Sequence, residues 1–327
     1  MPYVHDELST AAWYYVHDAT THHPKKQHKK SHHKPKAKPA KMGQKVKTEA
    51  SHASDLELFD FDCNLTHEDL RDHVPTLMQR AAAAGVKEML VPGATIEESQ
   101  RAIELCKLHP TKLFPTAGVH PYNARAMPMQ QELTTLRGLM DLEEVRAVGE
   151  CGLDYSPSFP EAEFQKKWFA EQLKMACQLK KPLFLHERLA HDDFIKLIDE
   201  ATAKSNGYFP PAVVHCFTGT EEELKAYIAR GDDWYIGITG FIFKKQGAAL
   251  KEMVKHVPLD RLVLETDAPY MGFPKCRRAE LSDTKKQYPN VPSAMPLVAQ
   301  AVATALGRSP QEVAKVTRAN ARRFLRL

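Results

Sequence analysis

The 327-residue sequence lacks the signals of several protein classes. Its six cysteines are scattered without a CxxC pair, which favours a reducing, intracellular compartment. No stretch approaches the roughly 20 apolar residues that a membrane span needs. Because no apolar run stands near the start, we expect no secretory signal, and the absence of arginine from residues 1–24 argues against a mitochondrial presequence.

Glycine-rich motifs are also scarce. The two richest stretches are GECG at 149–152 and TGTEEE at 218–223. Neither has the spacing of a phosphate-binding P-loop or of a dinucleotide fingerprint. A GxSxG nucleophile elbow is absent as well, so the sequence gives no support to a serine hydrolase of that kind.

The basic residues are concentrated at the N-terminus. Residues 1–50 hold ten lysines against four acids, a net +6, so the whole-chain +4 leaves the remainder at −2. We predict that residues 1–54 form a disordered Lys/His/Pro-rich tail, because residues 21–47 contain too few apolar side chains to order themselves. Besides a solvated tail, the open roles are a nuclear address, metal capture by its histidines, and a non-specific nucleic-acid arm.

From residue 55 onward, short apolar runs alternate with segments of helical period. A helix is expected over 161–180, and two more over 293–306 and 309–325. This alternation predicts an α/β fold, a TIM (β/α)8 barrel occupying residues 55–327. The eight runs that we expect to form strands are Leu56–Leu65, Glu88–Pro92, Leu113–His120, Val145–Leu153, Pro182–His186, Ala212–Phe217, Tyr235–Gly240 and Leu262–Asp267.

Six of these eight runs carry a carboxylate or an imidazole at or near their carboxyl ends. Active sites of such barrels lie at the carboxyl ends of the strands, so these side chains are expected to converge. In the first run, alternation places Asp60, Asp62 and Asn64 on one face. The other polar ends are His120, Glu150, His186, His215 and the Glu265-Thr266-Asp267 segment.

Glu150 follows a buried apolar run, where an unpaired carboxylate is costly and needs a cation. A salt bridge to a basic residue is the simplest partner. The convergence of acids and histidines from six strands favours a metal ion instead, and oxygen and imidazole ligands suit Mg²⁺, Mn²⁺ or Zn²⁺. Metal-bound water is a nucleophile near neutral pH, which indicates hydrolysis. Cys151 and Cys216 should point away from the cluster by strand alternation.

Seven motifs in order resemble the TatD-type metal-dependent deoxyribonucleases, from about Leu58 to the C-terminus. They are GVHPY (118–122), GECGLDY (149–155), LH (185–186) followed by Arg188, HCFTG (215–219), YIGITG (235–240), ETDAPY (265–270) and NARRFL (320–325). The resemblance implies a metallo-dependent hydrolase barrel. Its activity would be that of a 3′-to-5′ exonuclease with Mg²⁺ on single-stranded or frayed DNA, with RNA as a further possible substrate.

The resemblance also implies roles for individual residues. Glu150 would bridge two ions, although the number of ions, one or two, stays open. His186 and His215 would hold one ion, and Asp267 would ligate the other or steer the attacking water. His120 would lie near the scissile phosphate. Asp62 and Asn64 stand where many relatives have an HxH pair, and Asp62 remains a hard oxygen ligand. Loop residues that we expect at the substrate are Arg188, Tyr270, Arg277 and Arg278.

Two other functions stay open at this point. One is hydrolysis of an amide or ester, such as removal of D-amino acids from tRNA. A metallo-barrel of that kind usually bridges its metals with a modified lysine on the fourth strand, where this chain has Glu150. The other is a non-enzymatic binding role for a degenerate barrel, which only the missing HxH pair supports. We expect an intracellular protein without membrane contact, cytoplasmic or directed to the nucleus by its tail.

Overall fold

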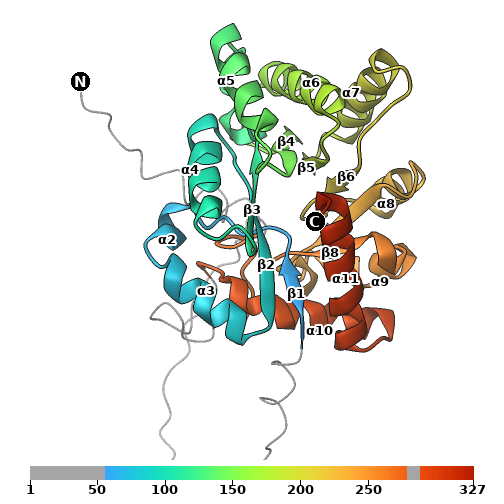
Figure 1. The fold of residues 1–327 in the computed structure, drawn as a ribbon. Coiled ribbons are helices and arrows are strands. Elements are labelled where there is room, and N and C mark those ends of the chain that lie inside the picture. Colours follow the sequence, from blue (N-terminus) through green and yellow to red (C-terminus); the bar gives the residue numbers. More distant parts are fainter. Residues whose placement is uncertain (1–55, 278–287) are drawn as a thin grey trace, which may run out of the picture. The chain divides into compact units, whose positions relative to one another are not determined.

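The computed structural model describes residues 56–277 and 288–327, in which eight strands alternate with helices as the sequence predicts (Figure 1). The predicted tail, residues 1–54, lies outside the described residues, and so does Arg278. The strands are β1 (Leu58–Asp60), β2 (Val86–Val91), β3 (Leu113–Ala117), β4 (Ala147–Asp154), β5 (Leu183–Arg188), β6 (Ala212–Val214), β7 (Trp234–Ile238) and β8 (Leu262–Leu264).

Each strand pairs in parallel with the next, in the order β1 to β8. Backbone bonds then bring the last strand back to the first. The amide of Phe61 donates to the carbonyl of Leu264 (2.9 Å), and the amide of Asp267 donates to the carbonyl of Asp62 (2.9 Å). The predicted TIM barrel is therefore confirmed, and all strand carboxyl ends meet at one end of it.

Helices lie between and after the strands. Their starts follow ordinary capping chemistry: the Thr95 hydroxyl accepts from the Glu98 amide, and the Ser309 hydroxyl from the Glu312 amide. The three helices expected from the sequence are confirmed as α6, α10 and α11. The α-helices are α2 (Glu68–Arg71), α3 (Val74–Ala83), α4 (Ile96–Lys107), α5 (Gln130–Asp141), α6 (Ala162–Leu179), α7 (His191–Lys204), α8 (Glu221–Ile228), α9 (Leu250–Met253), α10 (Met295–Leu306) and α11 (Pro310–Leu325).

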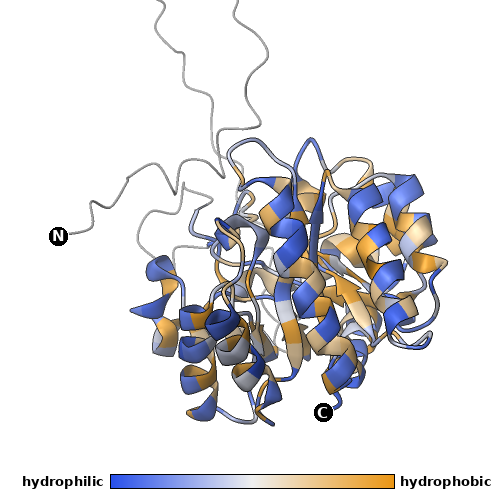
Figure 2. Cartoon of the chain, turned by 90° about the horizontal axis from the view of Figure 1, so that it is seen from above, coloured by the Kyte–Doolittle hydropathy of each residue, from blue (hydrophilic) through white to orange (hydrophobic). Residues whose placement is uncertain are grey.

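The barrel interior is a packed core. Alternate residues of the strands point inward and form a cluster of large side chains separate from the layer between sheet and helices. The ring of Phe324 from α11 enters this cluster and meets Phe61 (centroids 5.4 Å apart) and Tyr235 (5.5 Å). Figure 2 shows hydrophobic residues along the strands and hydrophilic ones on outer helix faces.

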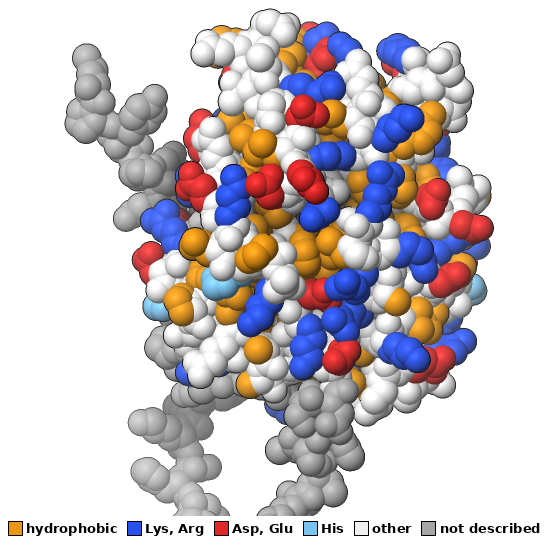
Figure 3. All heavy atoms as spheres, viewed as in Figure 1, with side chains coloured by type: hydrophobic (Ala, Val, Ile, Leu, Met, Phe, Trp, Pro, Cys, Tyr) orange, Lys and Arg blue, Asp and Glu red, His pale blue; other side chains and the backbone are white. Residues whose placement is uncertain are grey.

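The outer surface mixes charges of both signs, which Figure 3 shows for one face of the molecule. Within residues 56–277 and 288–327, no helix has the length and hydropathy needed to cross a membrane. Neither observation locates the functional site, which depends on the buried polar residues where the strands end.

Candidate metal centre

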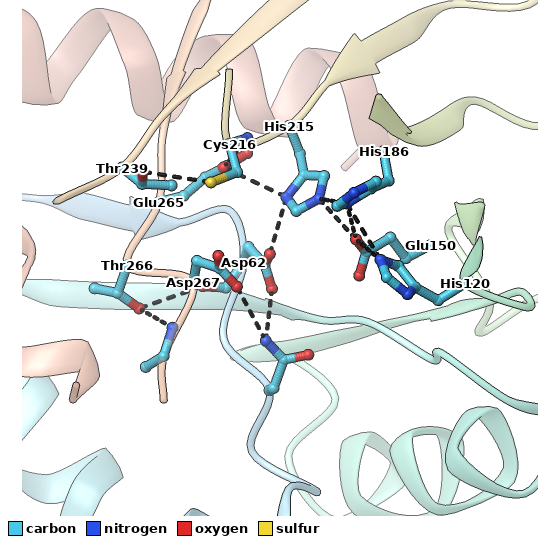
Figure 4. Close-up of polar contacts among 12 residues, drawn as sticks. Asp62, His120, Glu150, His186, His215, Cys216, Thr239, Glu265, Thr266 and Asp267 are labelled. Atoms are coloured by element: carbon cyan, nitrogen blue, oxygen red, sulfur yellow. Dashed lines mark hydrogen bonds and ion pairs between the residues drawn. The ribbon is translucent and has the colours of Figure 1, made fainter. Parts of the chain in front are cut away.

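The predicted site residues come together at the carboxyl ends of the strands (Figure 4). Glu150 lies within β4 and His186 within β5, while Asp62, His120, His215 and Asp267 lie in the segments just after β1, β3, β6 and β8. All of them except His186 are at most 7% exposed. Six strands thus place titratable side chains in one buried cluster.

Glu150 is the centre of this cluster. Its Oε1 atom lies 3.2 Å from Nε2 of His120, 3.0 Å from Nδ1 of His186 and 2.7 Å from Nε2 of His215. The glutamate is only 7% exposed. The side chains that surround it are histidines, and no lysine or arginine of residues 56–277 and 288–327 forms an ion pair with it. The simple salt bridge considered from the sequence is therefore not what the structure shows.

Two groups of donor atoms are compact enough to hold a cation. His120, Glu150 and His186 form one, and Asp62, His215 and Glu265 form the other, with ligand atoms in each group within 4.8 Å of one another. His215 links the two groups, because its Nδ1 lies 3.1 Å from Oδ2 of Asp62 while its Nε2 contacts Glu150. Nitrogen and oxygen donors of this kind suit Mg²⁺, Mn²⁺ or Zn²⁺.

The second group contains buried nitrogen and oxygen atoms that form no hydrogen bond with the described residues. Oδ2 of Asp62, Nδ1 of His215 and Oε1 of Glu265 form no hydrogen bond of good geometry with those residues, although the first two atoms lie 3.1 Å apart as an ion pair. Asp62 and Glu265 are completely buried, and His215 is 4% exposed. Buried polar atoms are nearly always satisfied, so three such atoms around one space fit a bound cation.

Neighbouring charges shift the pKa values of Glu150 and His215. Burial alone would raise the pKa of Glu150, but the charges of His120 and His215 hold that pKa well below its usual range. Burial would lower the pKa of His215, yet the neighbouring Glu150 charge and its hydrogen bonds raise that pKa well above the ordinary value. The cluster therefore stabilises positive charge beside Glu150.

The pKa values of Asp62 and Asp267 are shifted in the opposite direction. Burial raises the pKa of Asp62 to about 7, and burial together with the Asp62 charge raises the pKa of Asp267 well above its ordinary value. These acids repel one another, so without a cation they tend to keep a proton. A divalent ion would replace those protons and satisfy several carboxylates at once.

The polar residues at and just after the end of β1 have different roles. Asn64 donates its side-chain amide toward Oδ1 of Asp62 (3.4 Å) and Oδ1 of Asp267 (3.5 Å). It therefore acts as a hydrogen-bond donor between two acids. Asp60 accepts from both the amide (2.8 Å) and the hydroxyl (2.6 Å) of Thr266, so it joins β1 to the segment after β8.

Glu265 belongs to a segment that the sequence predicts at the convergent strand ends, but the sequence alone assigned it no role of its own, and the structure groups it with Asp62 and His215. Alternation places it on the same face as Asp267, two positions later, which is the signal that could have found it. Its Oε2 accepts the backbone amide of Cys216 (2.8 Å). A Cβ on Gly237 in β7 would overlap its carboxylate, so glycine makes the room that Glu265 occupies. Cys216 contributes that amide, while its thiol lies 3.5 Å from the Thr239 hydroxyl.

The four residues predicted at the substrate lie in different environments. Arg188 ends β5 and is half-buried, and the half-buried ring of Tyr270 packs edge-on against His67 (5.4 Å). Arg277 is 4% exposed and donates to the Tyr288 carbonyl (3.1 Å), so it supports a loop. Arg278 lies outside the described residues. Contact of these residues with substrate stays a prediction.

Comparison with known proteins agrees with this geometry. A sequence profile described as TatD related DNase matches residues 59–326. The chain belongs to the TatD related DNase family. It is 38% identical to the 3′-5′ ssDNA/RNA exonuclease TatD of Erwinia tasmaniensis over 83% of this chain and 100% of that protein. It is 36% identical to the protein of that name from Salmonella typhimurium, over 81% and 97%.

Solved structures of similar proteins share the fold. The YJJV TatD homolog of Escherichia coli K12 superposes with a TM-score of 0.72 at 26% identity, over 83% of this chain and 98% of that one. An uncharacterized amidohydrolase of Saccharomyces cerevisiae gives 0.70 at 27% identity, over 82% and 99%. The family resemblance seen in the motifs is therefore confirmed over the described barrel.

Proposed function

We propose that this protein is a divalent-metal-dependent nuclease that hydrolyses phosphodiester bonds at the 3′ end of single-stranded or frayed DNA. The observation that carries the proposal is the single carboxylate oxygen of Glu150 within 3.2 Å of three histidine nitrogens. The names of the relatives, 3′-5′ ssDNA/RNA exonuclease TatD, support the substrate and the polarity, and they make RNA a second substrate.

Two ions can be accommodated by the donors present. Glu150, His186 and His215 would hold one. Asp62 and Asp267 would hold the other, with Glu265 supplying a further oxygen. Mg²⁺ suits the carboxylate-rich side, and Mn²⁺ or Zn²⁺ suits the histidine-rich side. Such an ion supplies Lewis acidity toward a phosphoryl oxygen and lowers the pKa of a bound water.

In this proposal, His120 would hold a proton near the scissile bond. Its Nδ1 accepts the backbone amide of Tyr122 (3.1 Å), so in the neutral ring the proton lies on Nε2 and faces the cluster. Burial lowers the pKa of His120, which keeps the ring neutral near pH 7. A neutral Nε2–H can donate a hydrogen bond to a phosphate oxygen. Asp267 would accept a proton on the opposite side.

Oligonucleotides labelled at either end test the proposal directly. With Mg²⁺ or Mn²⁺, we expect stepwise shortening from the 3′ end, stopped by EDTA and restored by added metal. Glu150→Ala and Asp267→Ala should abolish this cleavage while circular dichroism stays unchanged. D-aminoacyl-tRNA and RNA belong in the same panel. Faster deacylation than DNA cleavage, or full activity in both variants, would contradict the assignment.

A further inference from the structure

A buried acid outside the two donor groups contacts one of their histidines. Asp154 ends β4 and is completely buried. Its Oδ2 lies 3.0 Å from Nε2 of His186, and its Oδ1 accepts the backbone amide of Ser156 (2.8 Å). An ionised carboxylate can only accept, so the proton of a neutral His186 ring lies on Nε2. The Nδ1 lone pair then faces Glu150, 3.0 Å away.

Asp154 is itself held in place by a buried glutamine of α6. The Oε1 atom of Gln165 accepts the Asp154 amide (2.8 Å), and its Nε2 donates to the Asp154 carbonyl (2.8 Å) and to the Pro160 carbonyl (2.7 Å). Gln165 is completely buried. One amide side chain thus fixes the backbone on both sides of the acid that contacts His186.

A second glutamine of α6 makes the same kind of contact with the β3 loop. Gln172 accepts the amide of Val119 (2.7 Å) and donates to its carbonyl (3.0 Å). The two glutamines are seven residues apart, so they share a helix face. Both satisfy buried backbone groups, which any structural glutamine does. The Gln165 contact differs because the side chain of Asp154 itself touches a metal-centre histidine, His186, whereas Val119 only precedes His120 in the chain.

We propose that Asp154, held by Gln165, is a positioning residue that fixes the tautomer and ring orientation of His186 so that Nδ1 faces the cation. This inference rests on the proposed metal centre and adds the residue that prepares its histidine. Partners of this kind typically change metal affinity by about 10- to 100-fold when they are replaced. Alternation places Asp154 on the same face of β4 as Glu150, four positions earlier.

Asp154→Asn tests the tautomer in the full-length chain. Asn keeps the oxygen that accepts the Ser156 amide, but its NH₂ group donates to Nε2 and moves the ring proton to Nδ1. We expect Mn²⁺ affinity, followed by the electron paramagnetic resonance of free Mn²⁺, to fall about 10- to 100-fold. In Zn²⁺-loaded protein labelled with ¹⁵N-histidine, the downfield Nε2–H signal of His186 should disappear. His186→Asn identifies that signal.

Gln165→Met provides a second route that leaves both charges in place, and Gln172→Met is its matched control. Loss of the Asp154 clamp should lower Mn²⁺ affinity and weaken the His186 signal. The control should leave that signal unchanged at similar thermal stability. If wild-type protein binds Mn²⁺ and Asp154→Asn binds it equally with the signal intact, the inference is wrong and the proposed function stands. A wild type that binds no Mn²⁺ overturns both.

Discussion

Oε1 of Glu150 lies 2.7 Å from Nε2 of His215, the shortest of its three contacts with histidine rings. Burial opposes the protonation of His215, but the Glu150 charge raises the pKa of this ring well above the ordinary value. The contact therefore favours a proton between the carboxylate and the imidazole, at a place that a metal ion also favours. The proton and the metal ion therefore compete for one place in the cluster, so metal binding should depend on pH.

Glu150→Gln should remove most of the metal-dependent activity. The change keeps the size of the side chain but removes the charge that three histidines surround. Replacing a residue that only supports a ligand costs about 10- to 100-fold, so loss of the central ligand should cost at least about 100-fold. Initial rates of oligonucleotide cleavage at saturating Mn²⁺ measure the effect.

Glu88→Gln is a suitable control for the loss of a buried acid. Glu88 lies in β2, is 4% exposed and pairs with Arg318 and Arg322 of α11, away from the strand ends that carry the site. Its replacement should lower the free energy of unfolding and leave the cleavage rate within about twofold, because buried ion pairs affect stability when broken. Equal cleavage rates in Glu150→Gln and Glu88→Gln would show that Glu150 is not part of the active site.

Asp62→Asn should change the number of bound ions. Asp62 supplies one of the two carboxylates in the group formed with His215 and Glu265. Isothermal titration with Mn²⁺ should show two ions in wild-type protein, with the weaker one reduced at least about tenfold in the variant. Asn64→Ala is the comparison, since its contacts are 3.4 and 3.5 Å long and its amide donates. We expect it to retain both ions, and a larger loss than in Asp62→Asn would reverse these roles.

Metal affinity should rise with pH near neutrality. Burial raises the pKa of Asp62 to about 7, so below that pH the carboxyl group holds a proton that an ion must displace. Each displaced proton lowers the apparent affinity by roughly tenfold per pH unit below the pKa. Mn²⁺ titrations between pH 6 and 8 should therefore show increasing affinity with a shallower slope in Asp62→Asn. A flat wild-type profile would contradict proton displacement at this group.

The close pairing of β4 with β5 predicts a large effect of Gly152→Ala on stability. Gly152 has a φ of +152°, and a Cβ there would overlap the carbonyl oxygen of His186. Overpacking against backbone should lower the free energy of unfolding by about 1–3 kcal/mol, in addition to the conformational strain. Gly207 has a φ of +82°, and a Cβ added there would have no atom within 4 Å. Gly207→Ala should therefore lower the free energy of unfolding only through conformational strain, by about 1–2 kcal/mol. Urea unfolding compares them, and equal losses would show that the overlap relaxes.

The fold could be predicted because the apolar runs and helical segments alternate regularly. Each strand of the barrel is buried on both faces, so it appears in the sequence as a short apolar run, as in Ala212–Val214. The polar residues that end those runs then predicted most of the centre, because parallel strands bring their carboxyl ends together. Period-two spacing alone also grouped Asp60 with the ligands, whereas the structure bonds it to Thr266.

Residues that act through another residue were harder to find. Asp154 follows Glu150 by four positions, but only the structure shows that it reaches His186 at 3.0 Å. Gln165 and Gln172 look like polar interruptions of an amphipathic helix until their backbone partners are known. These hydrogen bonds join different secondary-structure elements. Hydrophobic periodicity predicts helices and strands but not the hydrogen bonds between them.

Removal of residues 1–50 should separate binding from turnover. This segment carries ten of the 45 basic residues, and clustered lysines bind phosphates through release of counterions. We expect the truncated protein to bind single-stranded DNA more weakly, with a slope of log affinity against log salt that is shallower by about 0.7 per lost phosphate contact. Turnover at saturating substrate should be unchanged, because every proposed ligand lies beyond residue 55. Fluorescence anisotropy at several salt concentrations measures the slope. An unchanged slope would show that the tail does not contact the nucleic acid.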